Sequence, residues 1–195
     1  MKTRFDKIYW ENKYQEKATG WDIGYVSTPL VDYFKQLTNK KLRILIPGGG
    51  NCYEAEYLFE QGFENIYVID IAEQPLKNLK TRFPNFPVEH LIHDDFFNHQ
   101  EKYDLIVEQT FFCALDPFLR QKYADKMNDL LAEKGKLIGL LFDFELTEAG
   151  PPFGGSEAEY LQLFSKKFTI KKLERCYNSI KPRAGRELFF IFEKI

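Results

Sequence analysis

The stretch from Leu42 to Asp70 constrains the fold more than any other part of this sequence. It reads as an apolar run, a glycine-rich break at residues 47–51, a helical segment at Tyr53–Gln61 and a second apolar run at residues 66–69 that stops at Asp70. Glycines let backbone N–H groups approach a ligand closely, and the N-terminus of the next helix adds the positive end of its dipole. An acidic side chain about 20 residues beyond the glycine loop suits the two hydroxyls of a ribose. The spacing predicts a βαβ unit that binds an adenosine-bearing cofactor.

The glycine loop departs from the dinucleotide-binding fingerprint. In the pattern G-x-G-x-x-G/A the last position is glycine or alanine, whereas counting from Gly48 it is Tyr53 here. A nicotinamide-dependent oxidoreductase is therefore disfavoured. A tight turn without a ligand is the alternative, and Asp70 at the ribose-binding distance favours a cofactor site over it.

Length, charge and apolar runs limit the kind of partner. The 195 residues suffice for one well-buried α/β domain, so we expect a single domain over residues 1–195. A formal net charge of −2, from 27 basic and 29 acidic side chains, gives no field that would attract nucleic acid or an anionic membrane. No stretch approaches about 18 uninterrupted apolar residues, and Met1–Tyr14 lacks the apolar core of a signal peptide. We expect a cytoplasmic protein with a small-molecule partner, and the oligomeric state stays open.

The cysteines indicate neither a disulfide framework nor a metal site. Cys52, Cys113 and Cys176 are odd in number and lack ligand spacing. We interpret Cys113 as a packing residue, because no histidine is near it in sequence to activate it as a nucleophile.

The N-terminal segment is interpreted as a cofactor lid over residues 1–30. The first sixteen residues have the apolar spacing of an amphipathic helix, and Gly20 and Gly24 bracket Trp21 and Asp22 in the linker that follows. An aromatic face can stabilise a cation there, whereas a plain hydrophobic plug at Trp21 is the alternative.

Strands and helices alternate along the rest of the chain. Three further strands are predicted at Val88–Ile92, Tyr103–Val107 and Lys136–Phe142, and the runs Phe168–Tyr177 and Glu187–Glu193 pair as an antiparallel ribbon. Helices are predicted from Thr28 to Leu37, up to Arg82, from Arg120 to Leu131 and, behind a capping box at Ser156, up to Phe164. The fold class is α/β, a Rossmann-like seven-stranded sheet that is mostly parallel, with helices on both faces and a C-terminal antiparallel ribbon.

Acidic residues follow several of these strands. Ligands of open α/β sheets lie beyond the carboxyl ends of the strands. Of the pair Asp94 and Asp95, we favour Asp95 as the acceptor of a hydrogen bond from an adenine amino group, and a turn-forming role for both is the alternative. Ile71 is placed to cover one face of the adenine. The loop from Glu108 to Pro117 should face the reacting centre.

Several longer motifs are more specific than the glycine loop. They are Trp10…Thr19-Gly-Trp-Asp…Gly24…Thr28-Pro29-Leu30, Ile46-Pro-Gly-Gly-Gly, Asp70-Ile71-Ala72, Tyr103-Asp-Leu-Ile…Phe111-Phe-Cys-Ala…Pro117 and Gly150-Pro-Pro-Phe153. Over nearly its whole length the chain resembles the thiopurine S-methyltransferase family, and within it the halide/thiol methyltransferase branch. The resemblance implies S-adenosylmethionine as the cofactor. The cofactor-binding residues that the resemblance implies are Trp10, Trp21, Gly48, Asp70, Ile71, Asp95 and Phe96. Gly49, Gly50, Glu54 and Glu108 complete the predicted cofactor-binding set.

Three positions depart from the family pattern. Glu54 replaces the usual aspartate, Gly49 stands where cysteine is often found, and Phe153 stands where an aromatic hydroxyl often follows Gly-Pro-Pro. The first two are compatible with cofactor binding. The third bears on the acceptor, because Phe153 offers no hydroxyl to a small anion.

Methyl transfer from a sulfonium requires mainly that donor and acceptor are held close and aligned. A dry aromatic pocket that strips water from an anionic acceptor favours the reaction, and Phe111, Phe112, Phe153 and Tyr160 are the predicted lining. The segment after the fourth strand is Phe111-Phe-Cys-Ala and contains no Pro-Pro-Tyr-type element. This absence argues against nucleic-acid base amines as acceptors. No catalytic side chain is assigned.

The predicted acceptor is a small soft nucleophile, a thiol or hydrosulfide first and a halide second. No clear general base is present, since His90, His93 and His99 lie in or after the third strand. A thiol already has some thiolate at neutral pH and so depends less on a base than a hydroxyl or an amine does. The alternatives are a halide methyltransferase and a non-catalytic cofactor-binding module on the same fold.

Overall fold

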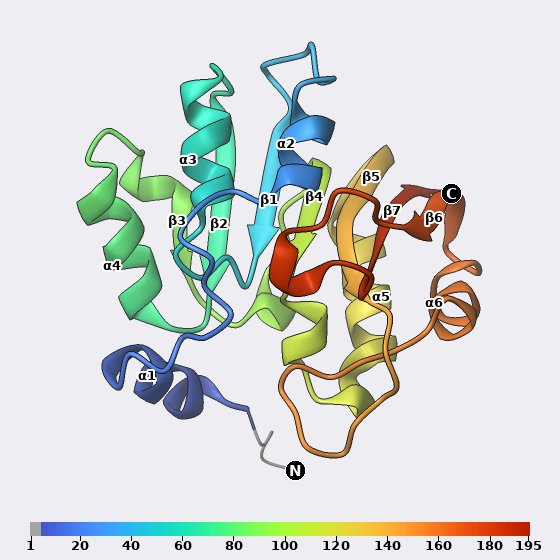
Figure 1. The fold of residues 1–195 in the computed structure, drawn as a ribbon. Coiled ribbons are helices and arrows are strands. Elements are labelled where there is room, and N and C mark those ends of the chain that lie inside the picture. The colour runs from blue at the N-terminus through green and yellow to red at the C-terminus, as the bar shows by residue number, and fades with distance from the viewer. Residues whose placement is uncertain (1–4) are drawn as a thin grey trace. The chain divides into compact units, whose positions relative to one another are not determined.

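The computed structural model describes residues 5–195, so the first four residues of the predicted N-terminal helix lie outside the described part. The chain divides into two compact units, residues 1–99 and residues 100–195, called here the N-terminal and the C-terminal unit. Each is described by itself (Figure 1).

The N-terminal unit contains the predicted βαβ arrangement. Strands β1 (Arg43–Pro47), β2 (Asn65–Asp70) and β3 (Leu91–His93) pair in parallel in the order β3-β2-β1. Apolar side chains on β1 and β2, among them Ile44 and Val68, are fully buried. The helical segments are α1 (Lys7–Gln15), α2 (Thr28–Phe34), α3 (Tyr53–Glu60), α4 (Glu73–Arg82) and the 3₁₀ turns η1 (Val88–His90) and η2 (Phe96–Asn98).

The C-terminal unit contains four strands in the order β4-β5-β7-β6. Strand β4 (Tyr103–Gln109) is parallel to β5 (Leu131–Phe142), and β7 (Glu187–Lys194) runs antiparallel to both β5 and β6 (Phe168–Arg175). The predicted C-terminal ribbon is therefore confirmed. The helical segments are η3 (Phe112–Ala114), η4 (Pro117–Leu119), α5 (Arg120–Leu130), α6 (Glu157–Phe164) and η5 (Lys181–Arg183).

Two elements differ from their predictions. The third strand is shorter than predicted, because Val88–His90 forms a 3₁₀ turn directly after Pro87, and Val88 is 65% exposed. Strand β5 begins at Leu131, ahead of its predicted start at Lys136. Lys134 has a φ of +60°, and the β4–β5 register shifts between Tyr103 and Leu105, so these residues form an irregularity in a strand rather than its start.

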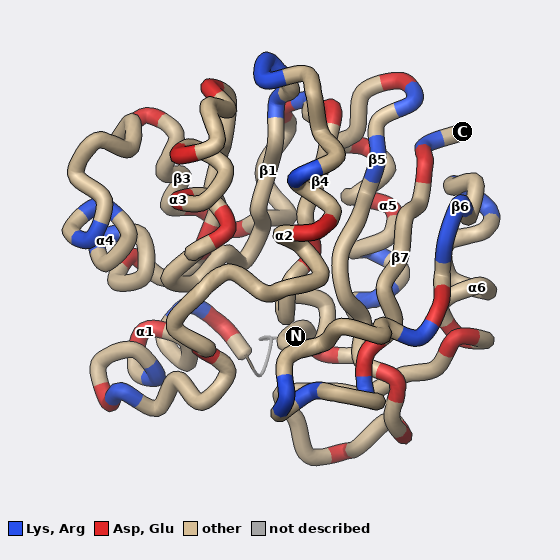
Figure 2. Tube along the Cα trace, turned by 45° about the horizontal axis from the view of Figure 1, so that its top comes forward, with Lys and Arg blue, Asp and Glu red and all other residues tan. Residues whose placement is uncertain are grey.

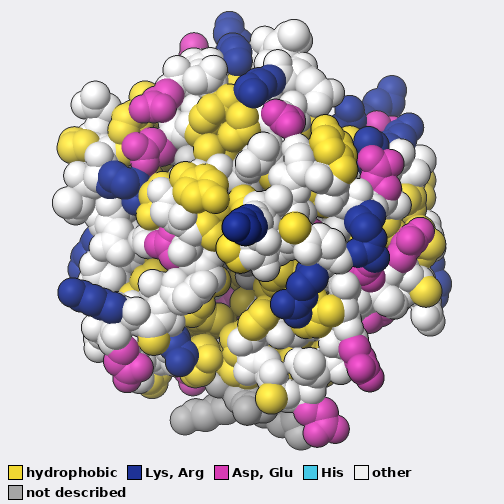
Figure 3. All heavy atoms as spheres, in the orientation of Figure 1, with side chains coloured by type: hydrophobic (Ala, Val, Ile, Leu, Met, Phe, Trp, Pro, Cys, Tyr) yellow, Lys and Arg dark blue, Asp and Glu magenta, His cyan; other side chains and the backbone are white. Residues whose placement is uncertain are grey.

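Charged side chains are interspersed rather than segregated. Lys and Arg alternate with Asp and Glu along the trace (Figure 2), and on the face in Figure 3 they lie among apolar and neutral side chains. Within residues 5–195 there is no helix whose length and apolar character would let it cross a membrane. The same residues contain no group of three or more His, Cys, Asp or Glu side chains that could hold a metal ion.

Candidate functional site

The glycine loop holds the carboxylate of Asp70. Gly48 and Gly50 have φ values of +56° and +55°, which glycine adopts without the steric cost of a side chain. The Gly50 N–H donates to Asp70 Oδ2 at 2.9 Å, and the Ala72 N–H donates to Oδ1 at 2.8 Å. The Gly48 N–H donates to the Ile69 carbonyl at 2.8 Å. These N–H groups therefore hold the end of β2 and the Asp70 carboxylate in place. The sequence had instead predicted that N–H groups of the loop face a ligand directly.

Asp70 retains the capacity to bind a ribose. A carboxylate has about four acceptor sites, and the two backbone N–H groups occupy two of them. Burial raises the pKa of Asp70 to about 6, while the bonds from Ala72 and Gly50 act in the opposite direction. The side chain is 8% exposed, so any group that reaches it is largely shielded from water.

Gly49 and Glu54 lie in the same turn. A Cβ at Gly49 would lie 2.6 Å from Val68 Cγ1, so the backbone packs against β2 at a distance that excludes a side chain. Glu54 is buried in the first turn of α3, at its N-terminal end, where the helix dipole favours a negative charge.

The two tryptophans of the predicted lid meet beside this loop. The rings of Trp10 and Trp21 pack edge to face with centroids 5.5 Å apart, and Tyr14 packs against Trp21 at 5.9 Å. A Cβ at Gly50 would lie 2.9 Å from the Tyr14 hydroxyl, which places that hydroxyl directly on the glycine loop. Sequence analysis missed Tyr14, although it follows Trp10 by one helical turn on the same face.

Polar contacts fix the N-terminal segment to the βαβ unit. Asn51 in the glycine loop donates from its side chain to Asp22 Oδ2, and Asn78 of α4 donates to Asn51 at 2.9 Å. Glu11 of α1 accepts from the Glu73 N–H at 2.6 Å, at the start of α4. The segment thus lies against the glycine loop, where the sequence predicts a lid.

The predicted adenine-binding residues follow β2 and β3. Asp95 Oδ1 accepts from the Phe97 N–H at 2.9 Å and caps η2, and Asp94 Oδ1 accepts from the Asp95 N–H at 2.7 Å. Both acids therefore form turns, and Asp95 has capacity for a further bond. Phe96 is buried, and the Ile71 carbonyl lies 3.2 Å from His93 Nε2. These residues of the N-terminal unit fit an adenosine-bearing group, with a carboxylate for the ribose and aromatic side chains beside the glycine loop.

Glu108, at the end of β4, organises the loop that follows it. Its Oε1 accepts from the N–H groups of Phe111 and Phe112 at 2.8 and 2.9 Å, and its Oε2 accepts from the Tyr123 hydroxyl. Glu108 is fully buried, and burial raises its pKa to about 7, against the opposing effect of these hydrogen bonds. All of these bonds stay within the C-terminal unit, so the structure gives Glu108 a positioning role there. Its predicted contact with the cofactor stays a prediction.

The predicted acceptor-binding aromatics form a packed cluster. Phe112, Phe153 and Tyr160 are buried, whereas Phe111 is half-buried. The rings of Phe112 and Tyr160 lie 5.7 Å apart, and the Tyr160 hydroxyl donates to the Phe142 carbonyl at 2.6 Å. The Phe153 N–H donates to the Cys113 carbonyl at 2.7 Å, which joins the Gly-Pro-Pro segment to the Phe-Phe-Cys-Ala loop.

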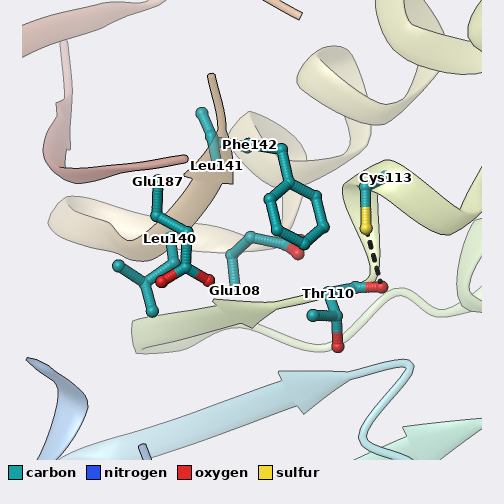
Figure 4. A pocket seen from close by; sticks show the side chains of 7 residues that line it. All are labelled: Glu108, Thr110, Cys113, Leu140, Leu141, Phe142 and Glu187. Carbon is teal, nitrogen blue, oxygen red and sulfur yellow. Dashed lines mark hydrogen bonds between the residues drawn. The ribbon is translucent and has the colours of Figure 1, made fainter. Parts of the chain in front are cut away.

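A small pocket lies beside this cluster, at the carboxyl ends of β4 and β5 (Figure 4). Its space of about 10 Å³ has room for roughly one water-sized group. Burial raises the pKa of the Cys113 thiol, whose Sγ donates to the Thr110 carbonyl at 3.4 Å, in agreement with a packing role. The pocket is lined by Glu108, Thr110, Cys113, Leu140, Leu141, Phe142 and Glu187.

Sequence analysis missed most of this lining. Glu187 carried the one usable signal, since it is an acidic residue at the start of the otherwise apolar run Leu188–Phe192. Thr110 is a β-branched residue with a φ of +60°, a conformation that only the structure reveals.

Comparison with known proteins decides the family. The profile of the thiopurine S-methyltransferase family matches residues 5–195. The chain belongs to this family. It is thereby a methyltransferase that uses S-adenosylmethionine, as its motifs predicted.

Relatives with assigned names come from plants and bacteria. A probable thiol methyltransferase 2 of Arabidopsis thaliana is 32% identical over 77% of this chain and 69% of its own length. The thiocyanate methyltransferase 1 of Brassica oleracea is 29% identical over 95% of this chain and 84% of its own length. A thiopurine S-methyltransferase of Acinetobacter baylyi is 26% identical, over 85% and 87% of the two chains.

Solved structures confirm the predicted fold class. A 1,6-didemethyltoxoflavin-N1-methyltransferase of Burkholderia thailandensis with bound S-adenosylhomocysteine has a TM-score of 0.76 at 17% identity, covering 96% of this chain and 86% of that one. The magnesium protoporphyrin IX methyltransferase of Synechocystis has a TM-score of 0.74 at 13% identity, covering 97% of this chain and 100% of that one. At such low identity the likeness shows the fold alone, the Rossmann-like methyltransferase arrangement.

Proposed function

We propose that this methyltransferase transfers the methyl group of S-adenosylmethionine to a small soft nucleophile, with a thiol or hydrosulfide preferred over a halide. The observation that carries the proposal is the water-sized pocket at the carboxyl ends of β4 and β5, whose walls include Leu140, Leu141 and Phe142. The pocket admits only a water-sized group, so a nucleic-acid base does not fit inside it. The names of the thiol and thiocyanate methyltransferase relatives support the same acceptor class.

In the proposed function, different residues of the chain bind different parts of the cofactor. In the proposal, Asp70 accepts from the ribose hydroxyls, Asp95 accepts from the adenine amino group, and Ile71 and Phe96 flank the ring. Trp10 and Trp21 contribute aromatic faces that stabilise a cation. When bound, S-adenosylmethionine supplies an electrophilic methyl group on a sulfonium. Because a packed aromatic wall excludes water, it favours a nucleophile that must lose its hydration before it reacts.

The proposal treats residues 1–195 as one methyltransferase domain, with residues 1–30 as a lid over the cofactor. It also places the enzyme in the cytoplasm, where thiols are kept reduced, since Cys52, Cys113 and Cys176 are all free.

A competition assay tests the acceptor class. Methyl-labelled S-adenosylmethionine is incubated with enzyme and with hydrosulfide, an aliphatic thiol or iodide at equal concentration, and the methylated products are quantified. We expect the two sulfur acceptors to react faster than iodide. Faster iodide methylation reverses the ranking. Tight binding of S-adenosylhomocysteine without turnover of any acceptor indicates the non-catalytic binding module instead.

A further inference from the structure

Glu187 places a second carboxylate in the acceptor pocket. It is the first residue of β7 and pairs in register with Phe142, the last residue of β5. Its side chain is only 2% exposed and lines the same pocket as Glu108 (Figure 4). Since β7 runs antiparallel to β5, the start of β7 lies at the carboxyl end of β5, the edge where ligands of α/β sheets bind.

The two carboxylates differ in their hydrogen bonds. Both oxygens of Glu108 accept hydrogen bonds within the C-terminal unit. In contrast, Glu187 Oε2 is buried and accepts no hydrogen bond from the described residues, and Oε1 lies 3.6 Å from Arg183 Nη1. A buried acceptor without a partner is unfavourable, and such atoms in native proteins usually meet a water molecule, an ion or a ligand. The Ser179 hydroxyl, itself buried without a hydrogen-bond partner, also acts on this carboxylate but forms no hydrogen bond to Oε2, which is the open acceptor among the described residues of this pocket.

We propose that Glu187 Oε2 accepts the proton of the S–H group of the methyl acceptor, so that the acceptor enters the pocket as a neutral thiol or hydrogen sulfide. The inference rests on the proposed function. In this step the S–H bond breaks, its electron pair stays on sulfur and the proton moves to Oε2. The thiolate formed in this way is the nucleophile of the methyl transfer, and the proton later leaves Glu187 for solvent.

The groups around Glu187 support this direction of proton transfer. Burial raises the pKa of Glu187, while the Ser179 hydroxyl and the Arg183 guanidinium lower it. A raised carboxyl pKa lies closer to that of a thiol, which makes the transfer less unfavourable. Arg183 on η5 lies 3.6 Å from Glu187, and Glu108 on β4 and Cys113 on η3 line the same pocket as Glu187.

A neutral acceptor also fits the charge of the pocket. Ionised Glu108 would repel an anion entering the pocket, and burial weakens the screening of that repulsion, whereas Arg183 offsets part of the charge of ionised Glu187. A neutral S–H group meets no such barrier and offers the hydrogen-bond donor that Oε2 lacks. The acceptor class that follows is a weakly acidic thiol or hydrogen sulfide.

The test compares acceptors that carry a proton with one that does not. In Glu187→Gln, methylation of an aliphatic thiol at pH 7 should fall by about 10²-fold, the usual contribution of a general base. Iodide has no proton to lose, so its methylation should not fall in this variant. Because the variant also removes a negative charge from the pocket, iodide methylation should stay the same or rise. The thiol rate of the variant should rise with pH as solvent forms thiolate, whereas the wild-type rate should depend less on pH.

Controls separate this role from a structural one. Glu174→Gln, at a side chain that is 54% exposed on β6, should change neither rate. S-adenosylhomocysteine affinity and the melting temperature of each variant report whether the fold is intact, and Glu187→Asp should restore part of the thiol rate. Equal losses for thiol and iodide overturn the proposal in favour of a structural role.

If Glu187→Gln does not fold, the wild-type pH profile decides. A thiol rate that simply follows the thiolate fraction in solvent overturns the proposal, and a flatter profile supports it. A wild-type enzyme that methylates neither thiols nor iodide refutes the proposed function instead, and the inference falls with it.

Discussion

The buried carboxyl of Glu108 gives a stability prediction with a definite sign. In Glu108→Gln the side-chain oxygen can still accept from the Phe111 and Phe112 N–H groups, and the new amide can donate to the Tyr123 hydroxyl. The variant therefore imitates the protonated form of Glu108 at every pH. The wild type instead must hold a buried negative charge once the pH exceeds the pKa of the carboxyl.

The size of the effect follows from the pKa. Burial raises the pKa of Glu108 from 4.5 to about 7. Because the folded state binds this proton more tightly than the unfolded state does, the stabilisation is fully present below pH 4.5 and is lost as the pH rises through 7. A difference of about 2.5 pKa units corresponds to about 3 kcal/mol. We expect Glu108→Gln to match the wild type below pH 4.5 and to be more stable by up to that amount above pH 8.

Urea unfolding at a series of pH values between about 5 and 8.5 measures this difference, given coincident transitions from two probes. Asp70, whose pKa burial raises to about 6, adds a pH dependence of the same sign. That dependence is common to both proteins and cancels when they are compared. If the free energies of unfolding of wild type and variant change in parallel with pH, the reasoning is refuted. Such curves would show that protonation of Glu108 does not contribute to the pH dependence of stability.

Three further predictions follow from the contacts. Asp70→Ala should weaken S-adenosylhomocysteine binding by about 1–3 kcal/mol in calorimetry, because it removes the ribose acceptor; unchanged affinity would remove Asp70 from the site. Saturation with S-adenosylhomocysteine should slow hydrogen exchange in residues 5–25, and no added protection there would argue against the lid. Gly139→Ala should destabilise the protein far more than Gly20→Ala in chemical unfolding. A Cβ at Gly139 would lie 2.0 Å from the Glu108 carbonyl oxygen, whereas one at Gly20 meets nothing within 4 Å; equal effects would contradict the packing seen at Gly139.

The sequence predicted those elements that are determined by residues close together in the chain. The apolar runs of β1 and β2, the glycine loop and the Ser156 cap of α6 all appear where periodicity and capping chemistry put them, and Ser156 accepts from the Glu159 N–H. Strand β3 was overestimated, because the apolar spacing at Val88–Ile92 does not reveal that Pro87 starts a 3₁₀ turn. Short apolar runs are compatible with either conformation.

The candidate site was harder to predict because it depends on which atoms meet. Periodicity placed Glu108 near the reacting loop but gave no sign that this loop's own N–H groups occupy its oxygens. Glu187 stands in register with Phe142 only through the antiparallel pairing of β5 and β7, a contact between segments more than 40 residues apart in sequence. Tyr14 had the helical spacing of Trp10, yet only the structure shows that its hydroxyl lies on the glycine loop.

The bond between Glu11 and the Glu73 N–H complicates deletion experiments on the N-terminal segment. Helix α4 has no side-chain hydrogen bond from its own N-cap residue, Ala72, so α1 supplies an acceptor at that end. Cutting away the first sixteen residues would uncap α4 as well as open the turn beneath α1. Weak cofactor affinity of such a truncated protein would then have two causes, the loss of the lid and the destabilised N-terminal end of α4. Glu11→Ala beside Trp10→Ala separates the two effects, since only the former removes the acceptor that caps α4.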